Sequence, residues 1–454
     1  MSENRKTLIY VGVAAALLLL VLITTPGRVN PEEYSDVGEL FFEDFTDPNS
    51  ATTLEIIKFD EEIGTAKPFK VTFDGQIWAI PSHHNYPADG KDRLARTAAG
   101  LIGIKKDGFR SDNAADHEAC GVIDPLDETA TSLAGRGERV TVKDASGQVL
   151  ADLIIGRATG EEENLRFVRV PRQKRIYVSK LDLNISTSFA DWIETDLFKV
   201  EKDEIEKVII RDYFINERTR RVVKRGEVLL AKTNGDWKAG KMRSNEEINS
   251  TKMDSLLRGI DELSIVGVRP KPEGLSQSLS QAEENIPMSD EAMLSLQSKG
   301  YYFTRDGSLL SNEGELEVQT SEGLTYVLRF GEVLYGEAEA VTAGTEGSDE
   351  KSTGPGENRY LFITTSFNED FFIEPTQPRS LEFQGKSDED LTDTDKQNKE
   401  LYEKHEGWKK QVEKGQKKST LLRQRFAKWY YVISSSSFEK VHLKKSDLVQ
   451  KKSQ

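Results

Sequence analysis

Two stretches of the sequence, FKVTFDGQIWAI at residues 69–80 and VLLAKTNGDW at residues 228–237, follow the same pattern. In each, a run of strand-forming residues meets Asp-Gly or Asn-Gly and then reaches a Trp. These dipeptides are typical of the tight turns that join two antiparallel strands. Trp78 and Trp237 occupy equivalent places in the two stretches, so the chain presents the same predicted hairpin twice.

An amphipathic helix is predicted after each hairpin. Its apolar residues recur at intervals of four, three and three, which is the spacing of one helix face. They are Leu94, Ala98, Leu101 and Ile104 in the first copy, and Met253, Leu257, Ile260 and Leu263 in the second. The two helices are separated along the chain by the same offset as Trp78 and Trp237. Because two neighbouring elements share this offset, we infer an internal duplication.

The match resumes with a second hairpin at a larger offset, so the second copy has gained residues in between. The matching positions are Val140, Val142 and Gly147 in the first copy, and Leu316, Val318 and Gly323 in the second. Each hairpin ends on a glycine, Gly156 or Gly331. We expect the strand at residues 177–179 to correspond to the strand at 431–434, and a helix over 188–198.

The predicted fold is therefore α+β, with an N-terminal transmembrane helix followed by two tandem related lobes of mostly antiparallel sheet with packed helices. The first repeat lobe covers residues 51–200 and the second covers 201–449. Trp78 and Trp237 are expected to be mostly buried core residues, although exposed tryptophans could stack on sugars.

An insertion interrupts the second lobe. Residues 336–358 are rich in Gly, Glu, Ser and Thr, which predicts a flexible surface loop. Residues 375–425 form a charged helical arm with one apolar stripe at Leu401, Trp408 and Val412. Two interpretations of the arm stay open: a solvated helix that leans on the domain, or a helix that binds a partner.

The N-terminus carries an apolar run, residues 8–24, that contains no charged residue. Arg5 and Lys6 precede it and acidic residues follow, so the positive-inside rule makes residues 1–7 a cytoplasmic tip and 8–24 a transmembrane signal anchor. Residues 25–50 are predicted to be a tether with at most one short helix, around 37–45. A cleaved signal peptide is the alternative.

Composition excludes several classes of protein. The formal net charge of −15 argues against nucleic-acid binding through phosphate contacts. Cys120 is the only cysteine in the sequence, which excludes intrachain disulfides, cysteine-rich zinc modules and cysteine-held iron–sulfur clusters.

Short motifs that resemble nucleotide sites lack necessary parts. Gly385-Lys386-Ser387 has Ser380 where a phosphate-binding loop needs its first glycine. The Gly-Arg-Gly sequence at residues 135–137 lacks the third glycine of a dinucleotide site. We therefore predict no cofactor-binding residues and no cofactor.

Candidate metal ligands are equally incomplete. His117 and Cys120 supply two ligands where zinc needs three or four, and His83 and His84 could add the rest only through the tertiary fold. The acidic run at 388–395 lacks the alternating oxygens and central glycine of an EF-hand. We predict no metal site and no catalytic residues, and the binding residues stay unknown.

The arrangement as a whole resembles bacterial envelope proteins that carry domain of unknown function 4340. The resemblance rests on the basic tip, the single span, the paired elements and the closing segment FAKWYYVISSSSFEKVHLKKSDLV, residues 426–449, which is similar to the ends of long planctomycete-type members. The long insertion at 336–425 departs from the shorter members.

The resemblance implies a non-enzymatic, membrane-anchored auxiliary or scaffolding component of a gliding-type ABC transport complex. Its expected partners are the inner membrane, an ABC transporter permease and other auxiliary subunits, with no nucleic acid. The expected location is the inner membrane, with the N-terminus cytoplasmic and the bulk of the chain periplasmic. The alternative is an envelope enzyme or glycan-binding module that uses the cleft between the two lobes.

Overall fold

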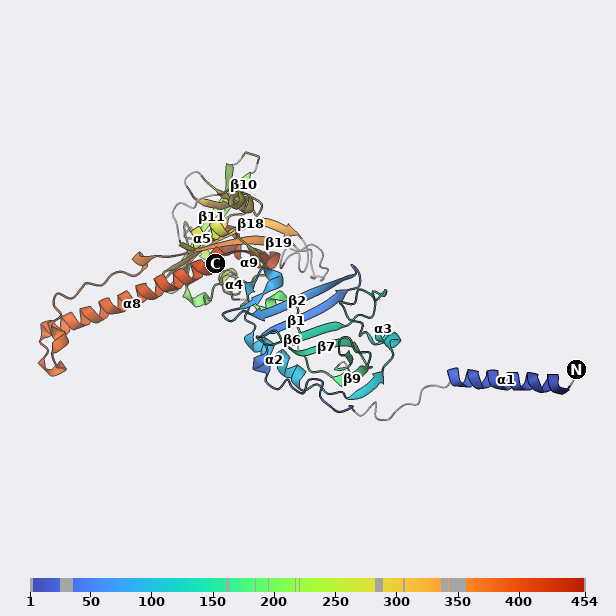
Figure 1. Cartoon of the computed structure of the whole chain (residues 1–454). Coiled ribbons are helices and arrows are strands. Elements are labelled where there is room, and N and C mark those ends of the chain that lie inside the picture. The colour runs from blue at the N-terminus through green and yellow to red at the C-terminus, as the bar shows by residue number, and fades with distance from the viewer. Residues whose placement is uncertain are drawn as a thin grey trace. The chain divides into compact units, whose positions relative to one another are not determined.

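The computed structural model of the chain, drawn in Figure 1, is dominated by two antiparallel sheets with helices. The structure describes residues 3–24, 36–160, 162, 164–183, 185–194, 196–216, 218–219, 221–281, 289–304, 307–335, 342 and 357–452. The mixed α+β class built on large antiparallel sheets, predicted from the sequence, is confirmed.

The first sheet has nine strands in the order β4-β3-β2-β1-β6-β7-β8-β9-β5. Asp74 and Gly75 form the predicted turn between β2 and β3, with Gly75 at a φ of 99°. The strands are β1 (Thr53–Asp60), β2 (Thr65–Phe73), β3 (Trp78–Ile80), β4 (Tyr86–Pro87), β5 (Gly108–Ser111), β6 (Glu138–Lys143), β7 (Val149–Ala158), β8 (Leu165–Arg169) and β9 (Ile176–Lys180).

The second sheet has eight strands in the order β12-β11-β10-β17-β18-β19-β20-β14. Asn234 and Gly235 make the turn between β11 and β12. The strands are β10 (Ile205–Asn216), β11 (Arg221–Thr233), β12 (Asp236–Ala239), β14 (Gly267–Pro270), β17 (Glu315–Thr320), β18 (Leu324–Tyr335), β19 (Glu357–Phe367) and β20 (Trp429–Ser434).

The two sheets follow one strand order. Read across each sheet, β3-β2-β1-β6-β7-β8-β9-β5 corresponds strand by strand to β12-β11-β10-β17-β18-β19-β20-β14. The two glycines that end the second hairpins also match. A Cβ at Gly156 would collide with the carbonyl oxygen of Cys120, and a Cβ at Gly331 with that of Lys299. Both glycines therefore let a second backbone segment approach the sheet closely.

Helices cover these sheets. The helix predicted in each copy is present as α2 and α4, and each buries its apolar stripe. The helices beyond the N-terminal one are α2 (Lys91–Ile102), α3 (His117–Cys120), α4 (Ser250–Asp261), α5 (Glu273–Gln281), α6 (Asp290–Gln297), α8 (Asp393–Ala427), α9 (Ser435–Val441) and α10 (Lys445–Leu448).

Two small sheets complete the second half of the chain. β13 (Glu246–Ile248) pairs with β21 (Val449–Lys451), and β15 (Tyr301–Phe303) pairs with β16 (Leu309–Ser311). Helices α5 and α6 pack their apolar residues against Tyr301, Phe362 and Tyr430, whose rings lie 5.3 to 6.0 Å apart. The added helices therefore pack against residues of the shared strands β19 and β20 and enlarge the core there.

Contacts divide the chain into two units, 1–68 with 94–185 and 69–93 with 186–454. The lobe boundaries 51–200 and 201–449 stay predictions. Sequence position alone therefore does not define the units, because residues 69–93 group with the second one.

The N-terminal helix α1 (Glu3–Thr24) covers the run expected to span the membrane, and its described side chains are those of residues 11–21. Over the residues that the structure describes, no helix has both the length and the apolar character that a membrane crossing needs. The transmembrane helix predicted over 8–24 is therefore not supported by the structure.

One predicted helix is wrong, whereas the tether was expected to hold at most one short helix and holds no α-helix among its described residues. Residues 37–45 form turns, and Gly38 has a φ of 96°, which a right-handed helix does not contain. Residues 188–198 contain only a 3-10 turn, Phe189–Trp192. There the Trp192 side chain is fully buried and its indole N–H donates to the carbonyl of Ser186 at 2.9 Å, so burial of Trp192 overrides the helical spacing.

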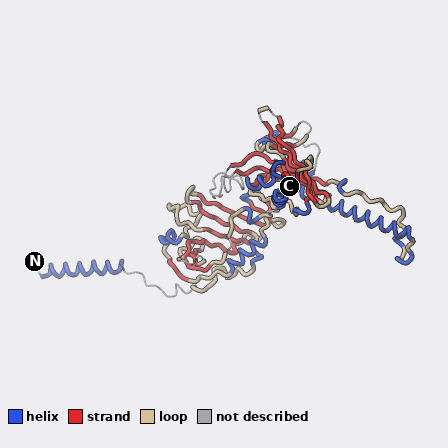
Figure 2. The backbone as a smooth tube through the Cα atoms, turned by 180° about the vertical axis from the view of Figure 1, so that it is seen from behind, coloured by secondary structure: helices blue, strands red, loops and turns tan. Residues whose placement is uncertain are grey.

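The two tryptophans are half-buried rather than buried, because β3 and β12 lie near the edges of their sheets. The loop predicted over 336–358 falls mostly outside the described residues. The charged arm predicted over 375–425 corresponds mostly to the 35-residue helix α8, which ends at Ala427. It is preceded by an irregular segment with short 3-10 turns, residues 368–392, that we call the strap. Figure 2 shows the strap leading outward beside the long helix α8, which runs back toward the sheet.

Two glycines of α8 predict opposite responses to alanine. Gly407 has open space around it, so Gly407→Ala should stabilise the protein by up to about 1 kcal/mol through helix propensity. At Gly415 a Cβ would overlap the ring of Phe367, so Gly415→Ala should destabilise it by about 1–3 kcal/mol. Urea unfolding of the two variants measures both effects, and equal stabilisation by both would contradict the packing of α8 on β19.

Candidate functional site

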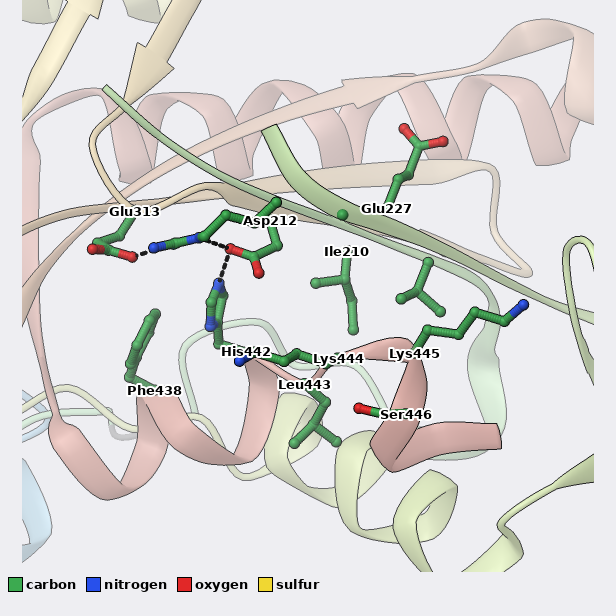
Figure 3. A pocket seen from close by; sticks show the side chains of 13 residues that line it. Ile210, Asp212, Glu227, Glu313, Phe438, His442, Leu443, Lys444, Lys445 and Ser446 are labelled. Carbon is green, nitrogen blue, oxygen red and sulfur yellow. Dashed lines mark hydrogen bonds and ion pairs between the residues drawn. The ribbon is translucent and has the colours of Figure 1, made fainter. Parts of the chain in front are cut away.

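The candidate site is a pocket of about 680 Å³ in the second unit, between the β10–β11 hairpin and the segment that contains α9 and α10. Figure 3 shows its side chains converging from these elements. Hydrophobic and charged residues share the lining, which consists of Ile210, Asp212, Arg225, Gly226, Glu227, Val228, Glu313, Phe438, His442, Leu443, Lys444, Lys445 and Ser446.

Arg225 organises the charged wall of this pocket. The pairing of β10 with β11 shifts register between Asp212 and Tyr213, which leaves Arg225 as the extra residue of a β-bulge. A bulge re-aims the side chain it carries. Arg225 Nε lies 2.6 Å from Asp212 Oδ1, and its Nη2 lies 2.6 Å from Glu313 Oε2.

These contacts fix the charge of Arg225. Burial works against the charged guanidinium, but its hydrogen bonds to Glu313 and Asp212 outweigh burial and raise the pKa of Arg225 above its usual value. Asp212 is only 8% exposed and shares its Oδ1 with Arg225. The aspartate is therefore committed to an ion pair and is a poor candidate for a free general base.

His442 stands on the other side of Asp212. Its Nε2 lies 3.5 Å from Asp212 Oδ1, is buried and makes no hydrogen bond with the described residues. The imidazole stacks on Phe438 with ring centroids 4.7 Å apart. Burial lowers the pKa of His442, although the carboxylates of Asp212 and Glu313 act in the opposite direction. At neutral pH a neutral imidazole with an unused nitrogen therefore faces the pocket.

The lining of the pocket carries both signs of charge. Its acidic residues are Asp212, Glu227 and Glu313, and its basic residues are Arg225, Lys444 and Lys445, of which Arg225 already pairs with Asp212 and Glu313. The apolar side chains of Ile210, Val228 and Leu443 provide contact area beside them. Such a pocket fits a polar group that carries donors and acceptors together.

The glycine motifs of the sequence have structural roles. Gly385 ends a 3-10 turn, Glu382–Gly385, and the nearby Lys386 pairs with Asp395 at 2.7 Å. Asp395 also caps the start of α8 with Thr392, and the hydrogen bonds from Lys386 and Thr392 lower its pKa to about 2. Gly135 has a φ of 77° and packs against the backbone of Glu118.

The candidate metal ligands are occupied by other contacts. His117 Nε2 lies 2.8 Å from the carbonyl oxygen of Lys174, and Cys120 is buried. His83 stacks on Phe189 with centroids 4.4 Å apart, and burial lowers its pKa to about 4. Over the described part of the chain, no three such side chains gather where they could hold a metal ion.

Asp212, Arg225, Glu313 and His442 were missed by reasoning from sequence. They come from four separate segments between residues 212 and 442, and none belongs to a local motif. The one signal in the sequence is the pair of facing charges at Asp212 and Arg225, on two strands joined by a short turn.

The middle of the chain matches the sequence model of a protein family. Residues 78–278, from β3 through most of α5, match the model of the family described as Domain of unknown function (DUF4340). The chain is a DUF4340 protein. No curated protein and no solved structure matches it. The DUF4340 match includes Asp212 and Arg225 but ends before Glu313 and His442, so it covers only part of the pocket.

Removal of Arg225 should cost this DUF4340 protein stability, because Asp212 would stay buried without its partner. We expect Arg225→Met to lower the free energy of unfolding by about 1–3 kcal/mol, and Asp212→Asn in the same chain to restore part of the loss. Arg258 is the control, since it pairs with Asp254 at the surface, and Arg258→Met should change stability by less than about 0.5 kcal/mol. If Arg225→Met and Arg258→Met lower the free energy of unfolding in urea equally, the ion pairs of Arg225 in the pocket do not stabilise the fold.

Proposed function

We propose that this DUF4340 protein is a non-enzymatic auxiliary or scaffolding subunit of an ABC-type envelope transport complex, anchored in the inner membrane by residues 8–24. The family resemblance and the uncharged N-terminal run support the anchor and the location. The observation that carries the scaffolding role is the strap on α8, because it presents large apolar side chains to water.

The strap is held in a defined conformation by hydrogen bonds to α8. The indole N–H of Trp408 donates to the carbonyl of Phe372 at 3.0 Å. Farther along, the backbone N–H of Arg379 donates to Asn398 Oδ1 at 3.0 Å. The strap and helix therefore form one ordered hairpin, and the side chains that it exposes have fixed places.

Ile373 in the first part of the strap is exposed between two residues that contact α8. The backbone carbonyl of Phe372 accepts from Trp408, and the Glu374 carboxylate lies 3.2 Å from His405 Nε2, whereas Ile373 is 89% exposed. Ile373 is the most exposed of the large apolar side chains that the structure describes. Phe371 and Leu381 on the same strap are 39% and 49% exposed.

This exposure favours a partner. Large apolar side chains exposed on a fixed surface are unfavourable in water, and the free energy falls when another protein covers them. The hairpin is also tied firmly to the sheet at its base, because the buried Lys271 donates to the carbonyl of Phe426, near the end of α8, at 2.8 Å. A rigid projection with an apolar edge is what a scaffold needs to hold a neighbouring subunit.

Replacement of the exposed isoleucine tests the proposal. Ile373→Ser should reduce recovery of an ABC permease with the tagged, detergent-solubilised protein by about tenfold, because an apolar contact at the centre of an interface is lost. Leu294 in α6 is 67% exposed and serves as the matched control, so Leu294→Ser should leave recovery unchanged. Mass spectrometry of the purified complexes measures both.

Three outcomes would contradict the proposal. One is equal recovery of the permease with both variants, and another is the absence of any transport subunit from the unmodified complex. The third is release of the chain from membranes by a carbonate wash, which would contradict the anchor.

A further inference from the structure

The β10–β11 hairpin extends beyond the sheet as a two-stranded ribbon. β10 pairs with β17 only through Arg211, whereas its pairing with β11 continues to Asn216. We call residues 212–216 and 221–226 the ribbon. In the first copy, β1 pairs with β6 through Ile57 and ends at Asp60, so its overhang is shorter. The same strand order therefore forms without a long ribbon, which points to a role outside folding.

The outer edge of the ribbon is open. Pairing of β11 with β12 begins at Leu230. One residue earlier, the carbonyl of Leu229 accepts from the backbone N–H of Gly240. Over residues 221–228, none of the described strands pairs with that edge of β11. The side chains of residues 221–227 are all exposed. An open edge offers backbone donors and acceptors to any extended chain that reaches it.

The tip of the hairpin and the β11 half of the ribbon that follows it are basic. Residues 218–225, RTRRVVKR, contain five Arg or Lys and no acidic residue, in a chain whose net charge is −15. Arg225 is engaged by Asp212 and Glu313, whereas Arg218, Arg221 and Lys224 are exposed. Val222 and Val223 between these cations are 41% and 39% exposed. The hairpin turn of the first copy is acidic instead, with Glu61 and Glu62.

We propose that the open edge of the ribbon binds an acidic extended segment of a partner protein, which adds to β11 as a further strand. Backbone hydrogen bonds along residues 221–228 supply the affinity, as in other cases of strand addition. Arg218, Arg221 and Lys224 select for acidic side chains by charge complementarity, and Val222 and Val223 offer apolar contacts on the two faces. This inference does not depend on the proposed transport role.

A peptide that cannot form strand hydrogen bonds separates this proposal from simple charge attraction. The probe is a fluorescent octapeptide of alternating Glu and Val, and its control is an octapeptide of alternating Glu and Pro with the same charge. Fluorescence anisotropy with the full-length protein in detergent should show binding of the Glu-Val peptide, and about tenfold weaker binding of the Glu-Pro peptide, because proline lacks the backbone N–H.

The protein variants make the test specific to the ribbon. Replacement of Arg218, Arg221 and Lys224 by Glu should weaken binding of the Glu-Val peptide by about tenfold or more. Replacement of the exposed Lys396, Lys410 and Lys417 of α8 by Glu changes the net charge equally and should leave binding nearly unchanged. Both variants should melt at the same temperature. If the variant with Glu at Arg218, Arg221 and Lys224 folds poorly, replacement of the same three residues by Gln repeats the test with a milder change.

Several results would overturn the proposal. Equal binding of the two peptides, or equally tight binding of an oligothymidylate, would make the ribbon a general anion-binding surface. An unchanged affinity in the ribbon variant would place the binding elsewhere. If neither peptide binds, the proposal is wrong, and the cations serve only to prevent edge-to-edge association of the sheet.

Discussion

The second half of this chain depends on the hydrogen bonding of one strand, β20, which is paired on both sides. Val432 of β20 faces Tyr360 of β19 and Gly267 of β14. Residues 429–433 of the strand are buried. Without β20, β14 would lose its place in the sheet, and the ring cluster around Tyr430 would lose its centre. Because β20 follows α8 in sequence, the sheet is completed only when nearly the whole chain has been made.

The shared strand order separates what the fold needs from what has been added to it. Both sheets contain the Gly-turn hairpin, the striped helix and the close approach at Gly156 or Gly331. The second copy adds the ribbon, α5 and α6, and the strap with α8. The exposed apolar and basic residues from which we infer partners lie on the ribbon and the strap. A duplicated scaffold that carries binding surfaces on its additions accounts for these features together.

The sequence predicted the elements that local physics determines. Asp74-Gly75 and Asn234-Gly235 need a positive φ at the glycine, and α2 and α4 are fixed by their apolar spacing. The correspondence of β9 with β20 was also predicted, from the Tyr-Val pattern, across an insertion. These signals are contained in a few adjacent residues, so one sequence is enough to find them.

The features that the sequence did not predict depend on contacts between distant segments. Asp212 and His442 lie far apart along the chain, and only the pairing of β10 with β11 and the placement of α9 bring them to 3.5 Å. The helix expected over 188–198 does not form, and Trp192 is instead fully buried with its ring 5.9 Å from that of Phe69. The exposure of Ile373 is likewise visible only once α8 covers the opposite side of the strap.

The completion of the second sheet by β20 is the central claim, and a thermal melt of two shortened chains tests it most directly. A chain that ends at Arg425 lacks β20 together with α9, α10 and β21 after it, and a chain that ends at Leu448 keeps β20, α9 and α10 but lacks β21 and the residues that follow it. Circular dichroism should show that the first loses the cooperative unfolding of the second unit, since a core face and a row of backbone groups become unpaired. The second should melt close to the parent. A chain ending at Arg425 that melts like the parent would contradict the account.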